Sequence, residues 1–419
     1  MTLDPEQMRQ RRVQRQQQRE KERKKTLIKM ATAGCFLLLS AAVILATINN
    51  PKSPSQTPQD TTAENIQNTQ PSPADPENTV IHLAVAGDLN VTEAVVNAGG
   101  SDYNYEKVFL DVAPLLANAD ITALNFEGSL YGAPYGSDRS APQSMAQALS
   151  NAGVDLVQLA NSYSIYKGMD GLSSTINGIR SAGMEPLGVY ESAAAAKKGK
   201  GYTICNVQGI SVAFVAFTKG MDGMALPPGN DGCVNLLYTD YASDYQEINV
   251  DGITKILSAV AKEKPDITVA LLHWGSEYND TISTSQNDIC TLMQENGVDA
   301  IIGTHSHYVQ QMTLDASTGN FIAYSLGDFF GDATRSGSEY SVILDLEITQ
   351  EAKSGKTKIT NFSYTPIFTV AEKDKPLRVL RIDDAMAAYD AGYIDRVSED
   401  TYKAMEYALT RIEKRISGE

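Results

Sequence analysis

The segment VDAIIGTHSH (298–307) runs from a short apolar stretch into two histidines. The stretch 298–303 is rich in Val, Ile and Ala, and its length suits one buried strand. His305 and His307 follow it, and residues two apart in extended backbone point to the same side. Ligands of open α/β sheets bind beyond the carboxyl ends of the strands. Imidazoles placed there suit a divalent metal, although this motif alone fits a pair of solvated loop histidines equally well.

Further polar residues stand at the ends of other apolar runs. They are Asp88 after IHLAVAG (81–87), Glu127 after ITALNF (121–126) and His273 at the end of ITVALLH (267–273). Five potential ligands at the ends of successive strands favour a metal site over a set of unrelated structural residues. Carboxylates can bridge two cations, and such a pair can clamp the oxygens of a phosphoryl transfer. The remaining histidine, His82, lies inside its strand, and we interpret it as structural.

Apolar runs alternate with amphipathic stretches from residue 80 onward. The pattern predicts strands at 81–87, 121–126, 154–160, 211–217, 267–273 and 298–303, and helices at 143–152, 168–182, 250–263 and 284–296. This alternation is typical of βαβ units, so we expect an α/β fold with largely parallel strands covered on both faces. Beyond 305, YVQQMTL, FIAYSLG, YSVILDLEI and KITNFSYTPIF predict antiparallel strands, and a helical extension follows at 371–419.

The N-terminal region divides into three parts by composition: a basic tail at 1–29, an uncharged apolar run at 30–48, and a Pro/Ser/Thr-rich linker at 49–79 that lacks the apolar residues for a core. About 20 apolar residues span a bilayer, so 30–48 predicts one transmembrane helix. Basic flanks stay in the cytoplasm, which places the C-terminal domain outside the cell membrane. A cleaved signal peptide is the alternative, but its basic region would be unusually long.

The charge is distributed unevenly along the 419 residues. Residues 1–29 carry ten Lys/Arg against four Asp/Glu, which is a net charge of +6. Because the whole chain has a net charge of −16, the remaining residues carry −22. A domain this acidic repels nucleic acid, which we exclude as a substrate.

Three cysteines, Cys205, Cys233 and Cys290, follow the apolar run. Their odd number and the absence of a C-x-x-C spacing favour buried free thiols, with one disulfide as the alternative.

Seven collinear segments carry a resemblance to a known family. They are VAGDLNVTEAV (85–95), ALNFEGSL (123–130), DRSAPQSMAQALSNAGVDLVQLAN (138–161), VAFVAFTKGMDGMALPPG (212–229), VALLHWGSEY (269–278), VDAIIGTHSHYVQQM (298–312) and FIAYSLGDFF (321–330). Over residues 80–370 the chain resembles the bacterial capsule-synthesis proteins of CapA and PgsA type, the poly-γ-glutamate capsule family. Seven segments in order are far more specific than one motif.

The resemblance implies a calcineurin-like metallophosphatase fold, a layered α-β-β-α sandwich. It also implies two divalent metal ions of the Mn, Fe, Zn or Mg class. The metal-ligand positions of the family fall on Asp88, Glu127, His273, His305 and His307. Arg139 lies in a matching block and could hold an anionic substrate group, with a surface ion pair as the equal alternative.

One block departs from the family pattern, which usually has L-A-N-N-H before an aspartate and a glycine. Here LANSYSIYKGMDGL (159–172) places Ser162 at the expected liganding Asn and Tyr163 at the His that assists catalysis, while Asn161 is retained. Serine is a poorer metal ligand than the carbonyl of an amide. A phenol with a pKa of about 10 is a poor proton donor and acceptor near neutral pH compared with histidine. We expect hydrolysis to be weakened or lost even if a metal binds, and loss of the metals themselves is the alternative. Asp328 also stands where the family usually has Asn.

Three functions follow from these observations. The first is a membrane-anchored, extracytoplasmic role in biosynthesis or export of a capsule polymer, with an anionic polymer and other synthesis subunits as partners. The second is an extracytoplasmic metal-dependent phosphoesterase. The third is a catalytically degenerate binding or scaffold module of the same fold. The sequence ranks the first highest as a family-level function and leaves the chemistry open between the other two.

Overall fold

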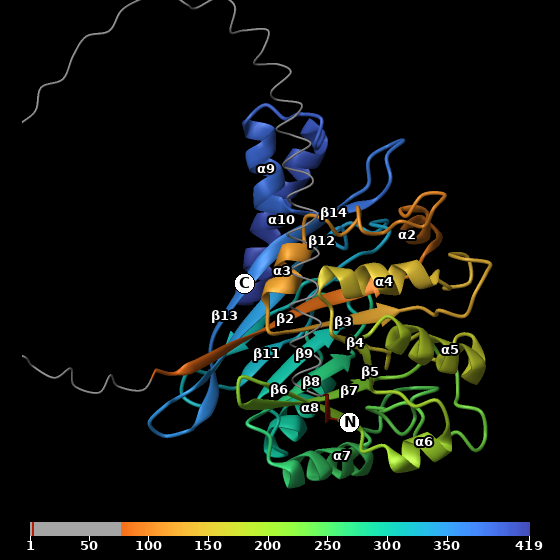
Figure 1. The fold of residues 1–419 in the computed structure, drawn as a ribbon, viewed down its shortest axis with the longest axis vertical. Coiled ribbons are helices and arrows are strands. Elements are labelled where there is room, and N and C mark those ends of the chain that lie inside the picture. The colour runs from red at the N-terminus through yellow and green to blue at the C-terminus, as the bar shows by residue number, and fades with distance from the viewer. Residues whose placement is uncertain (1, 4–76) are drawn as a thin grey trace, which may run out of the picture. The chain divides into compact units, whose positions relative to one another are not determined.

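Two β-sheets lie face to face, with helices on both outer faces (Figure 1). This computed structural model describes residues 2–3 and 77–419. The predicted span at 30–48, and nearly all of the predicted tail and linker, lie outside the described residues. Within the described ranges, no helix combines the length and the apolar character needed to cross a bilayer.

The first sheet carries Asp88 and Glu127. Its order is β14 (Arg378–Arg381), β13 (Thr357–Val370), β12 (Tyr340–Gln350), β2 (Thr79–Asn90), β3 (Ile121–Glu127), β4 (Leu156–Gln158) and β5 (Glu185–Leu187). Neighbours from β2 to β5 pair in parallel, and those from β2 back to β14 pair antiparallel. The short helices α2 (Glu93–Asn97) and α3 (Ala113–Asn118), with α4 (Gln143–Ala152) and α5 (Gly168–Ser181), pack on the β2–β5 half.

The second sheet carries His273 and leads into the His305 loop. Its order is β1 (Thr2–Leu3), β6 (Tyr202–Val207), β7 (Ile210–Thr218), β8 (Ile267–His273), β9 (Ala300–Thr304), β11 (Phe321–Ala323) and β10 (Met312–Leu314). The run β7, β8, β9, β11 is parallel, whereas β6 and β10 pair antiparallel with β7 and β11. Helices α7 (Val250–Glu263) and α8 (Thr284–Glu295) cover its outer face, and α6 (Ala193–Lys198) precedes β6.

The alternating strand pattern divides the apolar side chains among three cores. Residues such as Val85, Phe214 and Leu344 meet between the two sheets. The opposite faces of the same strands pack against the helices, for example Phe126 against the α4 and α5 side and Leu272 against the α7 and α8 side. Complete burial of one such side chain stabilises the fold by about 1.5–3 kcal/mol. The layered α/β architecture expected from the sequence is therefore confirmed.

The predicted elements match most closely where periodicity is long and regular. The helices predicted at 143–152 and 250–263 and the strand predicted at 267–273 have the bounds observed for α4, α7 and β8. The run 154–160 forms only β4, because the chain turns away after Gln158 to enter the site. As predicted, Cys205, Cys233 and Cys290 are buried and form no disulfide among the described residues.

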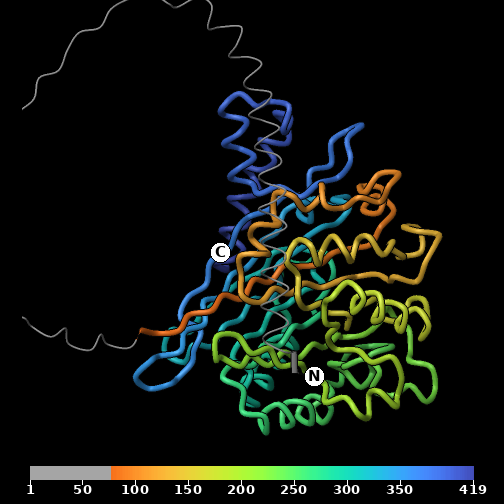
Figure 2. Tube along the Cα trace, viewed as in Figure 1, coloured from red at the N-terminus to blue at the C-terminus, as the bar shows by residue number. Residues whose placement is uncertain are grey.

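The C-terminal region contributes to the central core. After β14, helices α9 (Ile382–Asp390) and α10 (Glu399–Ser417) run side by side, and α10 packs against β12 and β13 (Figure 2). Its apolar face, which includes Met405, Ala408 and Ile412, is buried against these strands and continues the central hydrophobic core. Residues 78–419 belong to one compact unit.

Candidate metal centre

The five predicted metal ligands meet at one edge of the sandwich. Glu127 is the last residue of β3 and His273 the last of β8, whereas His305 and His307 follow β9. Asp88 lies near the carboxyl end of β2, and all five side chains are buried. They converge because the parallel strands of both sheets end at the same edge, where α/β folds place their ligand sites.

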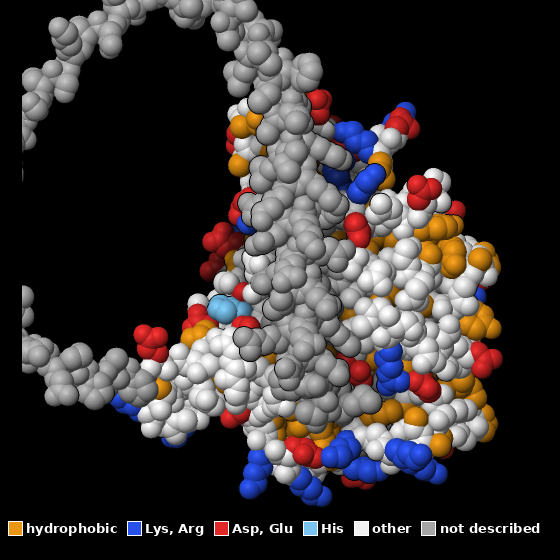
Figure 3. All heavy atoms as spheres, viewed as in Figure 1, with side chains coloured by type: hydrophobic (Ala, Val, Ile, Leu, Met, Phe, Trp, Pro, Cys, Tyr) orange, Lys and Arg blue, Asp and Glu red, His pale blue; other side chains and the backbone are white. Residues whose placement is uncertain are grey.

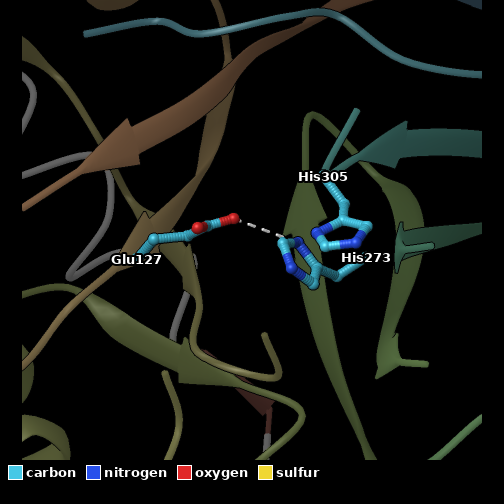
Figure 4. A group of neighbouring side chains, drawn as sticks. All are labelled: Glu127, His273 and His305. Carbon is cyan, nitrogen blue, oxygen red and sulfur yellow. Dashed lines mark ion pairs between the residues drawn. The ribbon is translucent and has the colours of Figure 1, made fainter. Parts of the chain in front are cut away.

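One group of donors consists of Glu127, His273 and His305, whose ligand atoms lie within 4.8 Å of one another. Glu127 reaches across from the first sheet toward the two imidazoles of the second (Figure 4). Its Oε1 lies 3.3 Å from Nδ1 of His273, and the two imidazole centroids are 4.4 Å apart. Both His305 and His307 have positive φ, at 89° and 59°. Such backbone strain in non-glycine residues is concentrated at functional sites.

A second group consists of Asp88, His307 and Asp328, again with ligand atoms within 4.8 Å of one another. Asp328 Oδ1 lies 2.7 Å from His307 Nδ1. The sequence did not single out Asp328 as a ligand. The available signal was its position after the SLG turn, a carboxylate where the family usually has an amide.

Glycines make the second group possible. The backbone N–H of Asp88 donates to the carbonyl of Gly327 at 3.0 Å. A Cβ on Gly87 would lie 1.8 Å from that same carbonyl oxygen, so only glycine permits this approach. Gly327 itself has a φ of +78°. The two chain segments therefore meet closely enough to bring their following aspartates, Asp88 and Asp328, into one group.

Three asparagine side chains hold the carboxylates in place. Asn125 Nδ2 donates to Asp88 Oδ1 at 2.6 Å and to Glu127 Oε1 at 3.2 Å. Asn161 Nδ2 in turn donates to Asn125 Oδ1 at 3.0 Å. In the second group, Asn90 Nδ2 donates to Asp328 Oδ1 at 3.1 Å. Asn161 thus supports the donors through Asn125. The sequence analysis did not identify Asn90 or Asn125 as residues of the site.

Ser162 and Tyr163, the two residues that depart from the family pattern, lie beside the metal-donor groups. Ser162 Oγ is 3.0 Å from His273 Nε2, so the serine occupies the expected position of the liganding amide. Tyr163 is largely buried, and burial raises its pKa to about 12 despite the opposing charge of Arg139. The phenol is therefore protonated at neutral pH and cannot serve as a general base there.

Arg139 joins the centre through Tyr163. Its Nη2 donates to the Tyr163 hydroxyl at 2.9 Å, and its guanidinium carbon lies 4.2 Å from the centre of that ring. Both residues line a cavity of about 90 Å³ that His307, Asp328 and Glu277 also line. The structure thus places a guanidinium beside the second donor group.

Burial without compensating charge shifts the ionisation of the donors. Burial raises the pKa of Asp88 to about 6 and lowers that of His305 to about 3. Burial, and then the charge of Asp88, raise the pKa of Glu127 well above its ordinary value. Burial opposes protonation of His307, yet the Asp328 carboxylate raises the pKa of that imidazole well above its usual value. A cation would relieve the repulsion among these buried carboxylates.

The donors fit a pair of divalent cations. Nδ1 of His305 is buried and has no hydrogen-bond partner in the described part of the chain, and an orphaned buried nitrogen is costly unless a ligand satisfies it. Neutral imidazoles combined with carboxylates are the ligand set of Zn, Fe and Mn sites. Glu127, His273 and His305 would hold one ion, and Asp88, His307 and Asp328 the other.

Curated relatives share most of the chain. A capsule biosynthesis protein CapA of Bacillus anthracis is 26% identical over 330 residues, covering 74% of this chain and 75% of that protein. A PGA biosynthesis protein CapA of Bacillus subtilis (strain 168) is 25% identical over 294 residues, covering 67% of this chain and 71% of its own.

Solved structures are similar at lower levels. A novel phosphatase from Mycoplasma pneumoniae has 14% identity and a TM-score of 0.43, covering 70% of this chain and 95% of its own. The calcineurin-like phosphoesterase YfkN of Bacillus subtilis has 14% identity and a TM-score of 0.42, covering 80% and 100%. At these scores the likeness carries no inference about chemistry.

The family described as bacterial capsule synthesis protein PGA_cap matches residues 82–333, more than half of the chain. The matched stretch contains every donor of both groups, from Asp88 to Asp328. The protein therefore belongs to the bacterial capsule synthesis family PGA_cap.

Proposed function

We propose that this protein is a membrane-anchored, extracytoplasmic component of capsule-polymer biosynthesis or export, of the poly-γ-glutamate type. We further propose that its metal centre binds an anionic group of the polymer or of a precursor. Family membership supports the capsule role, and the names of the two Bacillus relatives point the same way. The uncharged run at 30–48 behind a basic tail supports the anchor and the outward orientation.

One observation carries the proposal for the site: two buried donor groups lie beside a cavity that a guanidinium lines. Divalent cations held there would polarise an oxygen atom of a bound anion. Arg139 would orient the anion by its fixed fork of donors. Because the Tyr163 hydroxyl accepts a hydrogen bond from Arg139, its own proton is free to be donated to a ligand in the cavity.

A metal-dependent phosphoesterase is the second candidate, favoured by the same pair of donor groups. The residues around them support binding better than turnover. Tyr163 replaces a histidine of near-neutral pKa with a phenol of pKa about 12, and the hydroxyl of Ser162 contacts His273 where an amide ligand is expected. We therefore rank an anion-binding centre ahead of an efficient hydrolase.

Elemental analysis of the purified full chain tests the metal centre. We expect about two divalent ions per chain in the wild type. We expect a clear loss of metal in the triple-histidine variant, in which His273, His305 and His307 are all replaced by Ala. Wild-type protein that stays metal-free after incubation with Mn²⁺, Zn²⁺ or Fe²⁺ would refute the centre.

Gene deletion in the source organism tests the capsule role separately. We expect loss of surface polymer that the wild-type gene restores and the triple-histidine variant does not. An unchanged envelope in the deletion strain would sink the capsule role, while leaving the metal analysis intact.

A further inference from the structure

A second cavity, of about 560 Å³, lies between α6 and α7 over the end of β7. It shares no lining residue with the cavity at the metal centre. Its volume falls within the range of about 300–1,000 Å³ that is usual for small-molecule sites. A polymer strand or a protein surface would need an open groove, so the size favours a small ligand.

The inner wall of this cavity is mainly apolar. Phe217 from β7, Val234 and Leu236 from the loop after it, and Ile256 and Ala259 from α7 all line it. Phe217 and Val234 are almost completely buried, which fixes their positions in the wall. An apolar wall gains most from a ligand with an apolar body, because contact removes both surfaces from water.

Lysines surround the apolar wall. The cavity is lined by Lys197 of α6, by Lys200 from the segment after α6 and by Lys255 of α7, against one acidic residue, Asp231. Lys200 is paired with Glu263. In the part of the chain that the structure describes, Lys197 and Lys255 form no ion pair, so their ammonium groups are free for a ligand.

The surroundings strengthen the positive potential. Lys198, Lys262 and Lys264 lie on the same two helices or directly after them, in a domain that is otherwise strongly acidic. Figure 3 shows Lys and Arg side chains gathered along the lower edge of the molecule, where α6 and α7 lie in Figure 1. Asn249 and Gly252, at the amino end of α7, also line the cavity. This end of the helix dipole carries a partial positive charge.

We propose that this cavity binds a small organic anion whose apolar body contacts the partly exposed side chains of Leu236 and Ile256 and whose carboxylate, sulfonate or phosphate is held by Lys197 and Lys255. Neither the apolar wall nor the lysines alone define this class, but together they select amphipathic anions over neutral compounds and over inorganic ions. The site is independent of the metal centre and does not depend on its occupancy.

Isothermal titration of the full chain with naphthalene-2-sulfonate tests the site, with EDTA present so that no metal-bound anion contributes. Naphthalene-2-sulfonamide has the same body without the charge and serves as the matched neutral probe, and sodium sulfate as the anion without a body. We expect saturable binding of the sulfonate, at least about tenfold weaker binding of the sulfonamide, and no displacement by equimolar sulfate.

Variants locate the binding. Replacing both Lys197 and Lys255 by Ala should weaken the sulfonate about tenfold or more. Replacing Lys356 and Lys358, which carry the same charge just before and in β13 and do not line the cavity, should leave its affinity within about twofold. Ala259→Phe, which fills the wall, should weaken both naphthalene probes, and unchanged thermal unfolding would show that each variant is folded. Absence of sulfonate binding to the wild type, equal binding of the two probes, or equal loss in the two lysine pairs would overturn the proposal.

Discussion

Asp328 Oδ1 lies 2.7 Å from Nδ1 of His307, with both side chains buried. The contact joins the segment after β11 to the loop after β9, between residues that are 21 positions apart in the chain. It gives the second donor group two carboxylates and one imidazole, against one carboxylate and two imidazoles in the first. The first group is thus the softer of the two, and the second is better suited to Mn²⁺ or Mg²⁺.

Asp328→Asn tests whether this carboxylate is a ligand or holds one in place. The amide keeps the shape of the side chain and removes its charge, so we expect the ion at the group of Asp88, His307 and Asp328 to lose affinity by about 10- to 100-fold. Metal content after dialysis at fixed free Mn²⁺ measures the effect. Asp345→Asn, in the middle of β12 and in contact with His82 and not with a donor of either group, is the matched control. Equal metal content in wild type and Asp328→Asn would exclude Asp328 from the centre.

Metal removal should destabilise the protein. Ions that bind only the folded chain stabilise it by about 2.7 kcal/mol at a concentration 100 times the dissociation constant. We therefore expect the melting temperature in EDTA to rise by a few degrees when Mn²⁺ is restored in excess. The variant that lacks His273, His305 and His307 is the control and should show no such rise. A Mn²⁺ response of equal size in that variant would mean that the ion acts elsewhere on the chain.

Restoring the family pattern should create or raise hydrolysis. With Ser162→Asn and Tyr163→His together, an amide ligand returns, and an imidazole of near-neutral pKa replaces a phenol whose pKa is about 12. A positioned acid–base group contributes about 10²–10⁴-fold. Turnover of bis-p-nitrophenyl phosphate with Mn²⁺ is the measurement, and the single Tyr163→Phe variant shows whether the phenol contributes anything. A wild type as active as the double variant would show that Tyr163 does not limit catalysis.

The fold and most of the centre follow from local sequence signals. Continuous apolar runs such as ITVALLH specify buried strands, and a ligand at each strand end follows from the direction of the chain. Asp328 and the supporting asparagines could not be assigned in this way. The partner of Asn125 is Asn161, which donates to it from the segment after β4. Asp328 joins Asp88 because Gly87 and Gly327 permit close contact between their two segments. These relationships are tertiary and leave no periodic signal.

The structural histidine His82 predicts a pH dependence of stability. Nδ1 of His82 donates a hydrogen bond to Oδ1 of Asp345 at 2.9 Å, and this contact raises the pKa of His82 above its ordinary value. A raised folded-state pKa adds stability that is fully present below the unfolded value and is lost as pH rises through the folded value. Both side chains are nearly half exposed, so the contribution is below about 1 kcal/mol. We expect Asp345→Asn to destabilise the chain at pH 5.5 and to have little effect at pH 8.5. An equal loss at both values would assign the effect to packing.

The C-terminal helix contacts two loops around His307. The guanidinium carbon of Arg415 lies 4.5 Å from the ring centre of Tyr308, the residue after His307. Nη2 of Arg415 is also 3.4 Å from Oδ2 of Asp280, in the loop whose Tyr278 ring stacks on His307 at 4.8 Å. Arg415 is itself largely buried. The helix α10 lies beyond the matched family region, so this contact is a feature of the chain outside the shared core.

Arg415→Ala should therefore weaken Mn²⁺ binding at the group that contains His307, because Tyr308 and Tyr278 lose the side chain that fixes both loops. We expect a loss of about 3- to 10-fold, measured by titration. Arg415→Lys keeps the charge but not the planar stacking group, so it should restore the affinity only in part. Lys403→Ala, on the exposed face of the same helix, should have no effect. If Arg415→Ala lowers the melting temperature of the metal-free protein but leaves the Mn²⁺ affinity at the wild-type value, the arginine only anchors the helix. A fall in affinity at an unchanged metal-free melting temperature would instead show that α10 positions the metal loop.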